Sequence, residues 1–428
     1  MARISLVAAV CLLGAVCHSQ AEDGVLVMSS IVYRHGDRSA IDTFPTNTVG
    51  ESDWPQGFGQ LSQRGMKQHY LLGQYLHERY RLQTGLLNST YYLRKQMKVR
   101  STDVDRTLMS AQSQLSTFYP PQGFQVFEPS LPWMPLPVHT VPKHNDSLLR
   151  AYDTAANACP RYTQLYKDMS SLDYYQQVQN EHQEFINDVA KKAGIDYALS
   201  LGNIYTIEDP LFCQREHNLS RPAWATDEVL DKMHRLGSIS MGLMFQTKEM
   251  RMLTSGVLIN EMLVNMNNRS VELELPTENL FVYSAHDTTV TAVLQGLDIW
   301  NGEQPPYASC VFIELYKPMD GGEHYVRVLF RNETDRNDTV PVDLTPKLPM
   351  CGGQSQCPLS NFTRFYQDIV VDNWYNACHE NSTSSGLSSV SIASISIAGV
   401  FFIAFVVMLL LLLSRRRSTA GYSAVQGV

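Results

Sequence analysis

Residues 25–38 read VLVMSSIVYRHGDR, an apolar run that ends abruptly in charged residues. A short, almost unbroken run of Val, Ile and Leu is typical of a strand that is buried on both faces of a sheet. The charged group that begins at Arg34 would then lie at the carboxyl end of this strand. Ligands bind at that end of an open α/β sheet, so the run predicts an α/β fold with a candidate site in this loop.

The same order of strand, charged loop and helix recurs twice. Residues 96–99 predict a short strand that leads into Arg100 and a helix through Leu115, and residues 280–284 predict a strand that opens into His286 and Asp287. Residues 62–80 carry apolar side chains at helical spacing and predict a scaffold helix. We therefore expect three strand-end loops to build one ligand site.

Two further segments complete the expected organisation. Residues 159–253 are mostly polar and compatible with helices, which predicts a helical insertion or cap, mainly within residues 150–255. Residues 310–316 and 325–331 alternate as strands around the turn sequence Asp320-Gly321-Gly322. This pattern predicts an antiparallel hairpin at the sheet edge.

The side chains of the three loops suit a phosphoryl group. A planar guanidinium binds phosphate oxygens bidentately and stays charged, so Arg34, Arg38 and Arg100, with the imidazolium of His286, can hold the equatorial oxygens. In phosphoryl transfer the protein mainly positions groups and balances charge. Such a cationic cradle can do the work of the metal ion in other phosphatases, so we expect no metal and no cofactor.

His35 is the expected nucleophile, because a neutral imidazole is nucleophilic near neutral pH. A backbone carbonyl, such as that of Gly36, can fix the other ring nitrogen. Asp287 is the natural donor of the proton that the leaving alkoxide needs. Since Asp287 must be protonated while substrate is bound, the sequence predicts activity that is biased to acid pH.

The composition argues against one broad class of function. The net charge of −8 is unfavourable for a general nucleic-acid binder, which needs a clustered basic surface. The chain has 428 residues and is 44% hydrophobic, which is enough for one large domain or two of moderate size. Any phosphate recognition should therefore be local.

Both ends of the chain indicate the secretory pathway. Residues 1–21 have the basic start, apolar centre and small final residues of a cleavable signal peptide. Residues 390–413 form an uncharged apolar stretch before three arginines, which predicts a single membrane span followed by a cytosolic tail, residues 414–428. We expect a type I membrane protein with a lumenal or extracellular domain over residues 22–380 and a serine-rich stalk over residues 381–389.

The cysteines and the glycosylation sequons agree with an oxidising compartment. Two of the eight cysteines leave with the signal peptide, and the others suggest disulfides without fixing their partners: Cys159, Cys213, Cys310, Cys351, Cys357 and Cys378. The sequons all lie between the signal and the span, at Asn88, Asn145, Asn218, Asn268, Asn332, Asn337, Asn361 and Asn381.

The expected tail carries Tyr422 with Val425 three positions later, which resembles a tyrosine-based sorting signal. A flexible segment close to the membrane is where such a signal is read. The sequence therefore predicts cycling between the plasma membrane and endosomes or lysosomes, whose acidity fits the expected pH bias.

Three motifs resemble, in order and spacing, the histidine acid phosphatase family of the prostatic and lysosomal type: RHGDR at 34–38, VRSTD at 99–103 and YSAHD at 283–287. Further segments extend the resemblance over nearly the whole lumenal region: WPQGFGQL at 54–61, DRTLMSA at 105–111, PVHTVP at 137–142 and NGEQPPYASC at 301–310. One position departs from the family pattern, because Ala40 stands where a proline is usual, which affects loop rigidity more than chemistry.

The resemblance implies a phosphoglycerate-mutase-like mixed sheet flanked by helices, a smaller and mainly helical cap, a homodimer, and metal-free hydrolysis of phosphomonoesters. By motif it assigns phosphate binding to Arg34, Arg38, Arg100 and His286, phosphorylation to His35, and proton donation to Asp287. It also implies disulfides between Cys159 and Cys378, Cys213 and Cys310, and Cys351 and Cys357.

Several functions compete with an acid phosphatase. A phytase-like phosphatase would need a more basic pocket than the arginines identified here, and a mutase-like transferase would need a retained phosphate donor. A glycosylated surface receptor could use the same fold without turnover. Among phosphomonoesters, nucleotides, phosphotyrosine, lysophospholipids and small sugar phosphates all remain candidate substrates.

Overall fold

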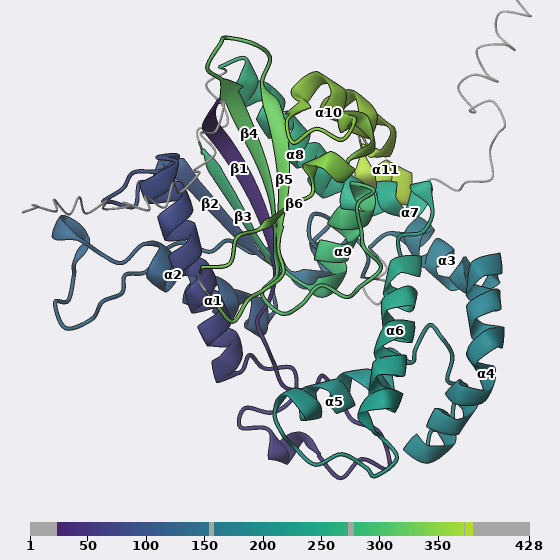
Figure 1. Cartoon of the computed structure of the whole chain (residues 1–428). Helices are drawn as coiled ribbons and strands as arrows, with labels where there is room; N and C mark the ends of the chain where they lie inside the picture. The colour runs from purple at the N-terminus through teal and green to yellow at the C-terminus, as the bar shows by residue number, and fades with distance from the viewer. Residues whose placement is uncertain (1–23, 154–157, 273–277, 337, 372, 380–428) are drawn as a thin grey trace, which may run out of the picture. The chain divides into compact units, whose positions relative to one another are not determined.

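The computed structural model describes residues 24–153, 158–272, 278–336, 338–371 and 373–379. In these residues a seven-stranded sheet has the order β2-β3-β1-β4-β5-β6 (Figure 1). The seventh strand, β7, pairs with β5. The strands are β1 (Gly24–Arg34), β2 (Met97–Ser101), β3 (Leu280–Ala285), β4 (Cys310–Pro318), β5 (Tyr325–Arg331), β6 (Val342–Asp343) and β7 (Cys357–Pro358). β3 is parallel to β1 and β2, whereas the remaining pairs are antiparallel, so the expected mixed sheet is confirmed.

β1 lies in the middle of the sheet, as its apolar sequence requires. It pairs with β3 on one side and β4 on the other, and its residues from Met28 to Arg34 are all buried. The register sets Arg34 beside Ala285 and Ser101 beside Ser284. The carboxyl ends of β1, β3 and β2 therefore lie side by side, which brings the three strand-end loops together.

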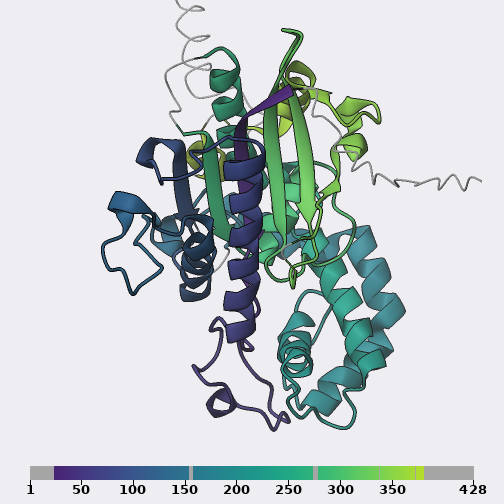
Figure 2. The same ribbon diagram turned by 60° about the vertical axis from the view of Figure 1, so that its left-hand side comes forward.

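Helices cover both faces of the sheet because side chains alternate along β1. Ile31 and Tyr33 pack under α1 and α2, while Val32 packs under α8, α9 and α10 on the opposite face. Figure 2 shows α1, in purple, lying along the first face. The helices are α1 (Gln63–Leu76), α2 (Asp105–Phe118), α8 (Ser255–Ser270), α9 (Asp287–Gly296), α10 (Leu359–Tyr366) and α11 (Trp374–His379).

The helical insertion expected between the second and third strands is present. It comprises α3 (Pro160–Asp168), α4 (Asp173–Ala193), α5 (Tyr205–Glu216), α6 (Asp227–Leu243) and α7 (Lys248–Leu253). Ile186, Leu211 and Leu236 from three of these helices share a buried cluster of their own, which also receives Phe44 from the loop after β1. This cluster fixes the insertion against the loop that carries the charged motif.

The predicted hairpin is confirmed, but its predicted position is wrong. β4 and β5 pair antiparallel from Cys310 opposite Arg331 to Tyr316 opposite Tyr325. β4 also pairs with β1, and β5 also pairs with β6 and β7, so neither strand forms the edge of the sheet. The alternating pattern does not reveal strands of two residues, and β6 and β7 are that short.

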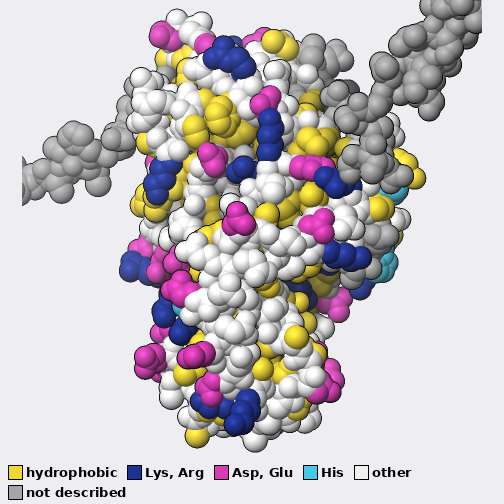
Figure 3. Space-filling view, turned by 90° about the vertical axis from the view of Figure 1, so that its right-hand side faces the viewer, with side chains coloured by type: hydrophobic (Ala, Val, Ile, Leu, Met, Phe, Trp, Pro, Cys, Tyr) yellow, Lys and Arg dark blue, Asp and Glu magenta, His cyan; other side chains and the backbone are white. Residues whose placement is uncertain are grey.

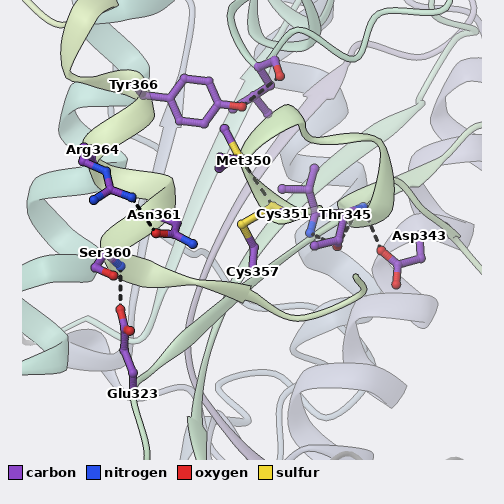
Figure 4. The surroundings of a disulfide bond; sticks show 12 residues. Glu323, Asp343, Thr345, Met350, Cys351, Cys357, Ser360, Asn361, Arg364 and Tyr366 are labelled. Atoms are coloured by element: carbon purple, nitrogen blue, oxygen red, sulfur yellow. Dashed lines mark hydrogen bonds between the residues drawn. A yellow bond between two sulfur atoms is a disulfide. The ribbon is translucent and has the colours of Figure 1, made fainter. Parts of the chain in front are cut away.

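Two of the three expected disulfides are present. Cys159 bonds to Cys378, and Cys351 bonds to Cys357 of β7, the short strand that precedes α10 (Figure 4). The pairing of Cys213 with Cys310 is contradicted, because both are buried free thiols. They belong to different packing clusters, Cys213 with Trp54 and the loop after β1, and Cys310 with the sheet face under α1 and α2.

The sequons fall in differently exposed places. Asn145, Asn218 and Asn332 are exposed, Asn88, Asn268 and Asn361 are partly buried, and Asn337 and Asn381 lie outside the described residues.

The expected signal peptide, stalk, membrane span and tail, with Tyr422 and Val425, also lie outside the described residues. No helix within the described ranges is long and apolar enough to cross a bilayer. On the face seen in Figure 3, Lys and Arg are interspersed with Asp and Glu.

Candidate active site

His35 follows β1 and is buried, with 1% of its surface exposed. Its Nδ1 lies 2.8 Å from the carbonyl oxygen of Gly36, as expected. Because a carbonyl only accepts, Nδ1 carries the proton and Nε2 keeps its lone pair. Burial, followed by the charges of Arg106, Arg34 and Arg38, holds the pKa of His35 well below its usual range. The ring is therefore neutral and available as a nucleophile.

Gly36 is required for this geometry. A Cβ at this position would collide with the backbone of Gly65 in α1. Because Gly36 has no side chain, the loop can approach α1 closely. This close approach keeps the His35 ring beside the Gly36 carbonyl that accepts its hydrogen bond.

Arg34 and Arg38 are both buried and both held by acidic or carbonyl partners. Arg34 donates to the Pro305 carbonyl at 2.7 Å and lies 2.9 Å from a carboxylate oxygen of Asp287. Arg38 makes a bidentate pair with Asp209 of α5, with distances of 2.7 and 3.2 Å. These contacts preorganise the two guanidiniums before any anion arrives.

Arg100 does not join this group, which corrects the sequence-based assignment. β2 continues to Ser101, so Arg100 lies within the strand and not in the loop that follows it. Its guanidinium pairs with buried Asp146 at 2.9 Å and lines a separate small cavity with Lys98 and Tyr283. Lys98 and Arg100 share one face of β2 because side chains two positions apart point the same way.

Arg106 occupies the place expected for Arg100. It is the second residue of α2 and lines the same cavity as His35 and His286. Among the described residues no carboxylate pairs with it; its Nη1 is 3.5 Å from the Gly59 carbonyl and its Nε is buried without a partner. Burial and the nearby charge of Arg38 lower the pKa of Arg106 to about 10. An anion between these guanidiniums would relieve that repulsion.

His286 lies opposite His35, with ring centroids 5.6 Å apart. Its Nε2 is 3.0 Å from Thr102 Oγ1 and 3.1 Å from Arg150 Nη1. Burial and the charges of Arg106 and Arg150 hold the pKa of His286 well below its usual range. His286 is therefore neutral in this structure, and the imidazolium that the sequence analysis expected is wrong.

Asp287 is the first residue of α9 and lies beside Arg34. Burial raises the pKa of Asp287, but Arg34, Arg38, the Thr288 backbone N–H and Arg106 together outweigh burial and lower it. Asp287 is thus a carboxylate in this structure.

These groups line one cavity of about 960 Å³ between the sheet and the helical insertion. One part is cationic, and the insertion adds an aromatic wall made of Tyr152, Tyr166, Tyr197, Tyr205 and Phe212. A larger groove of about 1810 Å³ runs along α1 and β5 and contains none of the predicted site residues.

Four residues of the site were missed by the sequence analysis: Arg106, Arg150, Asp209 and Tyr307, whose ring lies 4.0 Å from the Arg34 guanidinium carbon. Arg106 could have been identified from the sequence, because it belongs to the family-like segment DRTLMSA at the start of a helix. Asp209 is 171 residues from its partner Arg38, and neither it nor Arg150 belongs to a quoted motif.

Comparison with known proteins places the chain among phosphatases. The family model of the histidine phosphatase superfamily (branch 2) matches residues 25–331. Lysosomal acid phosphatase of Xenopus laevis is 40% identical over 404 residues, covering 92% of this chain and 88% of the relative. Prostatic acid phosphatase of Bos taurus is 42% identical over 352 residues, covering 82% and 86%.

Solved structures show the same fold at much lower identity. The phytase from Citrobacter braakii has a TM-score of 0.62 at 18% identity, covering 83% of this chain and all of that chain, 100%. Hafnia alvei phytase in complex with tartrate has the same TM-score at 18% identity, covering 83% and 99%. The family match, the relatives and the shared fold agree: this chain belongs to branch 2 of the histidine phosphatase superfamily.

Proposed function

We propose that the chain is an acid phosphatase that hydrolyses phosphomonoesters through a phosphohistidine on His35. The observation that carries the proposal is the neutral, buried His35 ring, whose Nε2 lone pair is free and whose surroundings contain Arg34, Arg38 and Arg106. The curated relatives named lysosomal and prostatic acid phosphatase support it.

In the first step Nε2 of His35 attacks phosphorus and the bond to the leaving oxygen breaks. The three guanidiniums balance the charge of the transferred group, and the Gly36 carbonyl accepts from Nδ1–H as the ring becomes cationic. Asp287, protonated once substrate is bound, gives its proton to the leaving oxygen. In the second step Asp287 takes a proton from water, which attacks the phosphohistidine and releases inorganic phosphate.

The charge balance of the cavity favours substrates with a single phosphate over inositol polyphosphates. Arg34 faces Asp287, Arg38 faces Asp209, and Arg150 faces Asp153, so most of the positive charge is already matched by carboxylates. A phytase-like pocket for many phosphates would need a large cationic excess. A mutase-like reaction would return phosphate to an acceptor and would release none to water.

We also propose the cellular setting that the sequence indicates. A signal peptide at residues 1–21, a span at 390–413 and a tail at 414–428 would place residues 22–380 in a lumen or outside the cell, joined by the stalk at 381–389. The relatives named lysosomal acid phosphatase support residence in lysosomes, and sorting would depend on Tyr422 and Val425. Glycosylation at the sequons and a homodimer are parts of the same proposal.

The test is phosphate release from an aryl phosphate between about pH 4 and about pH 8, with a chelator present and with His35→Ala alongside. Release that is biased to acid, resists the chelator and disappears in His35→Ala supports the proposal. If folded wild-type protein releases no phosphate at any pH, the proposal is wrong and a non-catalytic receptor becomes the better interpretation.

A further inference from the structure

Arg150 is a further guanidinium in the cavity, and neither the sequence motifs nor the proposed reaction uses it. It lies in the segment between α2 and α3, and 17% of its side chain is exposed. Nη1 lies 3.1 Å from Nε2 of His286, and Nη2 lies 2.6 Å from a carboxylate oxygen of Asp153. One side chain thus connects a carboxylate to an imidazole of the phosphate site.

The contact with His286 has only one chemical reading. A guanidinium can donate hydrogen bonds but cannot accept them, so Nε2 of His286 must be the acceptor and must lack a proton. The second neighbour, the Thr102 hydroxyl at 3.0 Å, can donate or accept and would tolerate either tautomer. Arg150 is therefore the group that decides which nitrogen of His286 is protonated.

We propose that Arg150 is a positioning residue that fixes His286 as the Nδ1–H tautomer, so that Nδ1 is the nitrogen that donates to the substrate phosphate. The inference rests on the proposed function, because it assigns a state to the histidine of that phosphate site. His35 and His286 then work as complementary tautomers. His35 keeps the lone pair on Nε2 for attack, and His286 offers the proton on Nδ1 to the oxygens.

A buried chain of contacts holds Arg150 in place, and Arg100 is part of it. The backbone N–H of Arg150 donates to the Asp146 carbonyl at 3.0 Å, and Asp146 Oδ1 accepts from the Leu149 N–H at 3.0 Å. Asp146 is buried and pairs with Arg100 of β2 at 2.9 Å. Arg100 therefore anchors the turn that carries Arg150, although its own side chain does not reach the catalytic cavity.

The surrounding positive charges protect this neutral tautomer against protonation in acid, and Arg150 is one of them. Arg106 comes from α2, Arg34 is the last residue of β1, and Arg38 lies in the loop that follows. Asp287 follows His286 in the chain. With Arg150 in place, a proton on Nε2 of His286 would face the N–H of the Arg150 guanidinium at hydrogen-bond distance, and two donors would repel each other. Without it, Nε2 can take a proton and donate to Thr102, and His286 then titrates at higher pH.

The experiment compares the full-length protein with Arg150→Met, Arg150→Lys and a matched control, Arg161→Met. Arg161 also pairs with a carboxylate, that of Glu249 at 2.5 and 2.7 Å, but it lies on α3 and does not line the cavity. Two quantities are measured between about pH 4 and about pH 7, the Kd of inorganic phosphate by calorimetry and kcat with KM for an aryl phosphate. The melting temperature of each variant is recorded.

We expect Arg150→Met to weaken phosphate binding about tenfold and to add an acid ionisation to the pH profile that wild type lacks. Arg150→Lys keeps a charged donor and should restore most of the wild-type profile, and Arg161→Met should match wild type. Arg100→Met should show the same added ionisation in a weaker form. A wild-type Kd and pH profile in Arg150→Met would overturn the proposal, as would equal losses in the Met and Lys variants.

Calorimetry with inorganic phosphate needs no turnover, so the two proposals can fail separately. Wild-type protein that binds phosphate but hydrolyses no ester would overturn the proposed function, while the comparison of Arg150 variants would still decide the tautomer.

Discussion

Arg34 Nη2 lies 2.9 Å from Asp287 Oδ2, so the proposed proton donor is paired with a proposed phosphate ligand. Burial raises the pKa of Asp287, but Arg34, together with Arg38, the Thr288 backbone N–H and Arg106, outweighs burial and lowers it. A substrate phosphate would compete for Arg34 and add negative charge beside the carboxylate. Both effects raise the pKa of Asp287, so substrate binding itself would favour the protonated acid.

This relationship predicts a shift in pH dependence. Removing the guanidinium in Arg34→Met takes away the first of the charges that lower the pKa of Asp287, so Asp287 should stay protonated to higher pH. In the pH profile of kcat, measured at saturating substrate, the alkaline limb should move to higher pH. KM should rise because a phosphate ligand is lost. Arg161→Met is the control. An unchanged limb, or one that moves to lower pH, would contradict the role given to the pair.

The role of Asp287 as proton donor predicts a dependence on the leaving group. Asp287→Asn should lower kcat by about 10²–10⁴-fold for an alkyl phosphate, whose alkoxide must be protonated as it departs. The loss in the phosphorylation step should be much smaller for a nitrophenyl phosphate, whose leaving group needs little help. Rapid-mixing measurements of alcohol release give this rate. Equal losses for both substrates would remove Asp287 from this role.

The different positions of Arg106 and Arg100 predict that their replacement weakens phosphate binding to different extents. Arg106→Met removes a guanidinium that lines the cavity and should weaken inorganic phosphate binding by about a hundredfold. Arg100→Met acts only through Asp146 and the turn beyond it, so the loss should be about tenfold or less. Calorimetry on the two variants measures both values. A greater loss for Arg100→Met would reinstate the motif-based assignment.

The state of the cysteines can be counted directly. Cys213 and Cys310 are free and buried, and burial raises the pKa of both thiols, so they should be unreactive in the folded protein. Titration of denatured, unreduced protein lacking the signal peptide should detect two thiols per chain. Mass spectrometry should assign them to these two residues. A protein without reactive thiols after denaturation would support the pairing that the family resemblance implies.

Much of the fold was predictable because local patterns determine it. The apolar run before Arg34 predicted β1. The repeated order of strand, loop and helix predicted that the carboxyl ends of β1, β2 and β3 would lie at the same end of the sheet. The edge of the sheet was not predictable. β6 and β7 contain two residues each, and such short strands depend on pairing with β5 and not on a pattern of their own.

The site was predictable only where its residues lie at the carboxyl end of a strand or in the loop just after it. His35, Arg34, Arg38, His286 and Asp287 line one cavity, as the three-loop model expected. The model failed at Arg100, because the end of β2 was placed two residues too early and the side chain was assigned to the loop. Asp209 and Arg150 come from segments that approach the site only through tertiary packing, and no local pattern identifies them.

The central claim, a phosphohistidine at His35, is tested most directly by trapping the intermediate. Asp287→Asn should form it readily from a radiolabelled nitrophenyl phosphate and hydrolyse it slowly, because the residue that activates water is lost. After an alkaline quench, the account predicts a label that is stable in base, is lost in acid, maps to the peptide containing His35, and is missing from a variant that also carries His35→Ala. No trapped label, or a label on another residue, would contradict it.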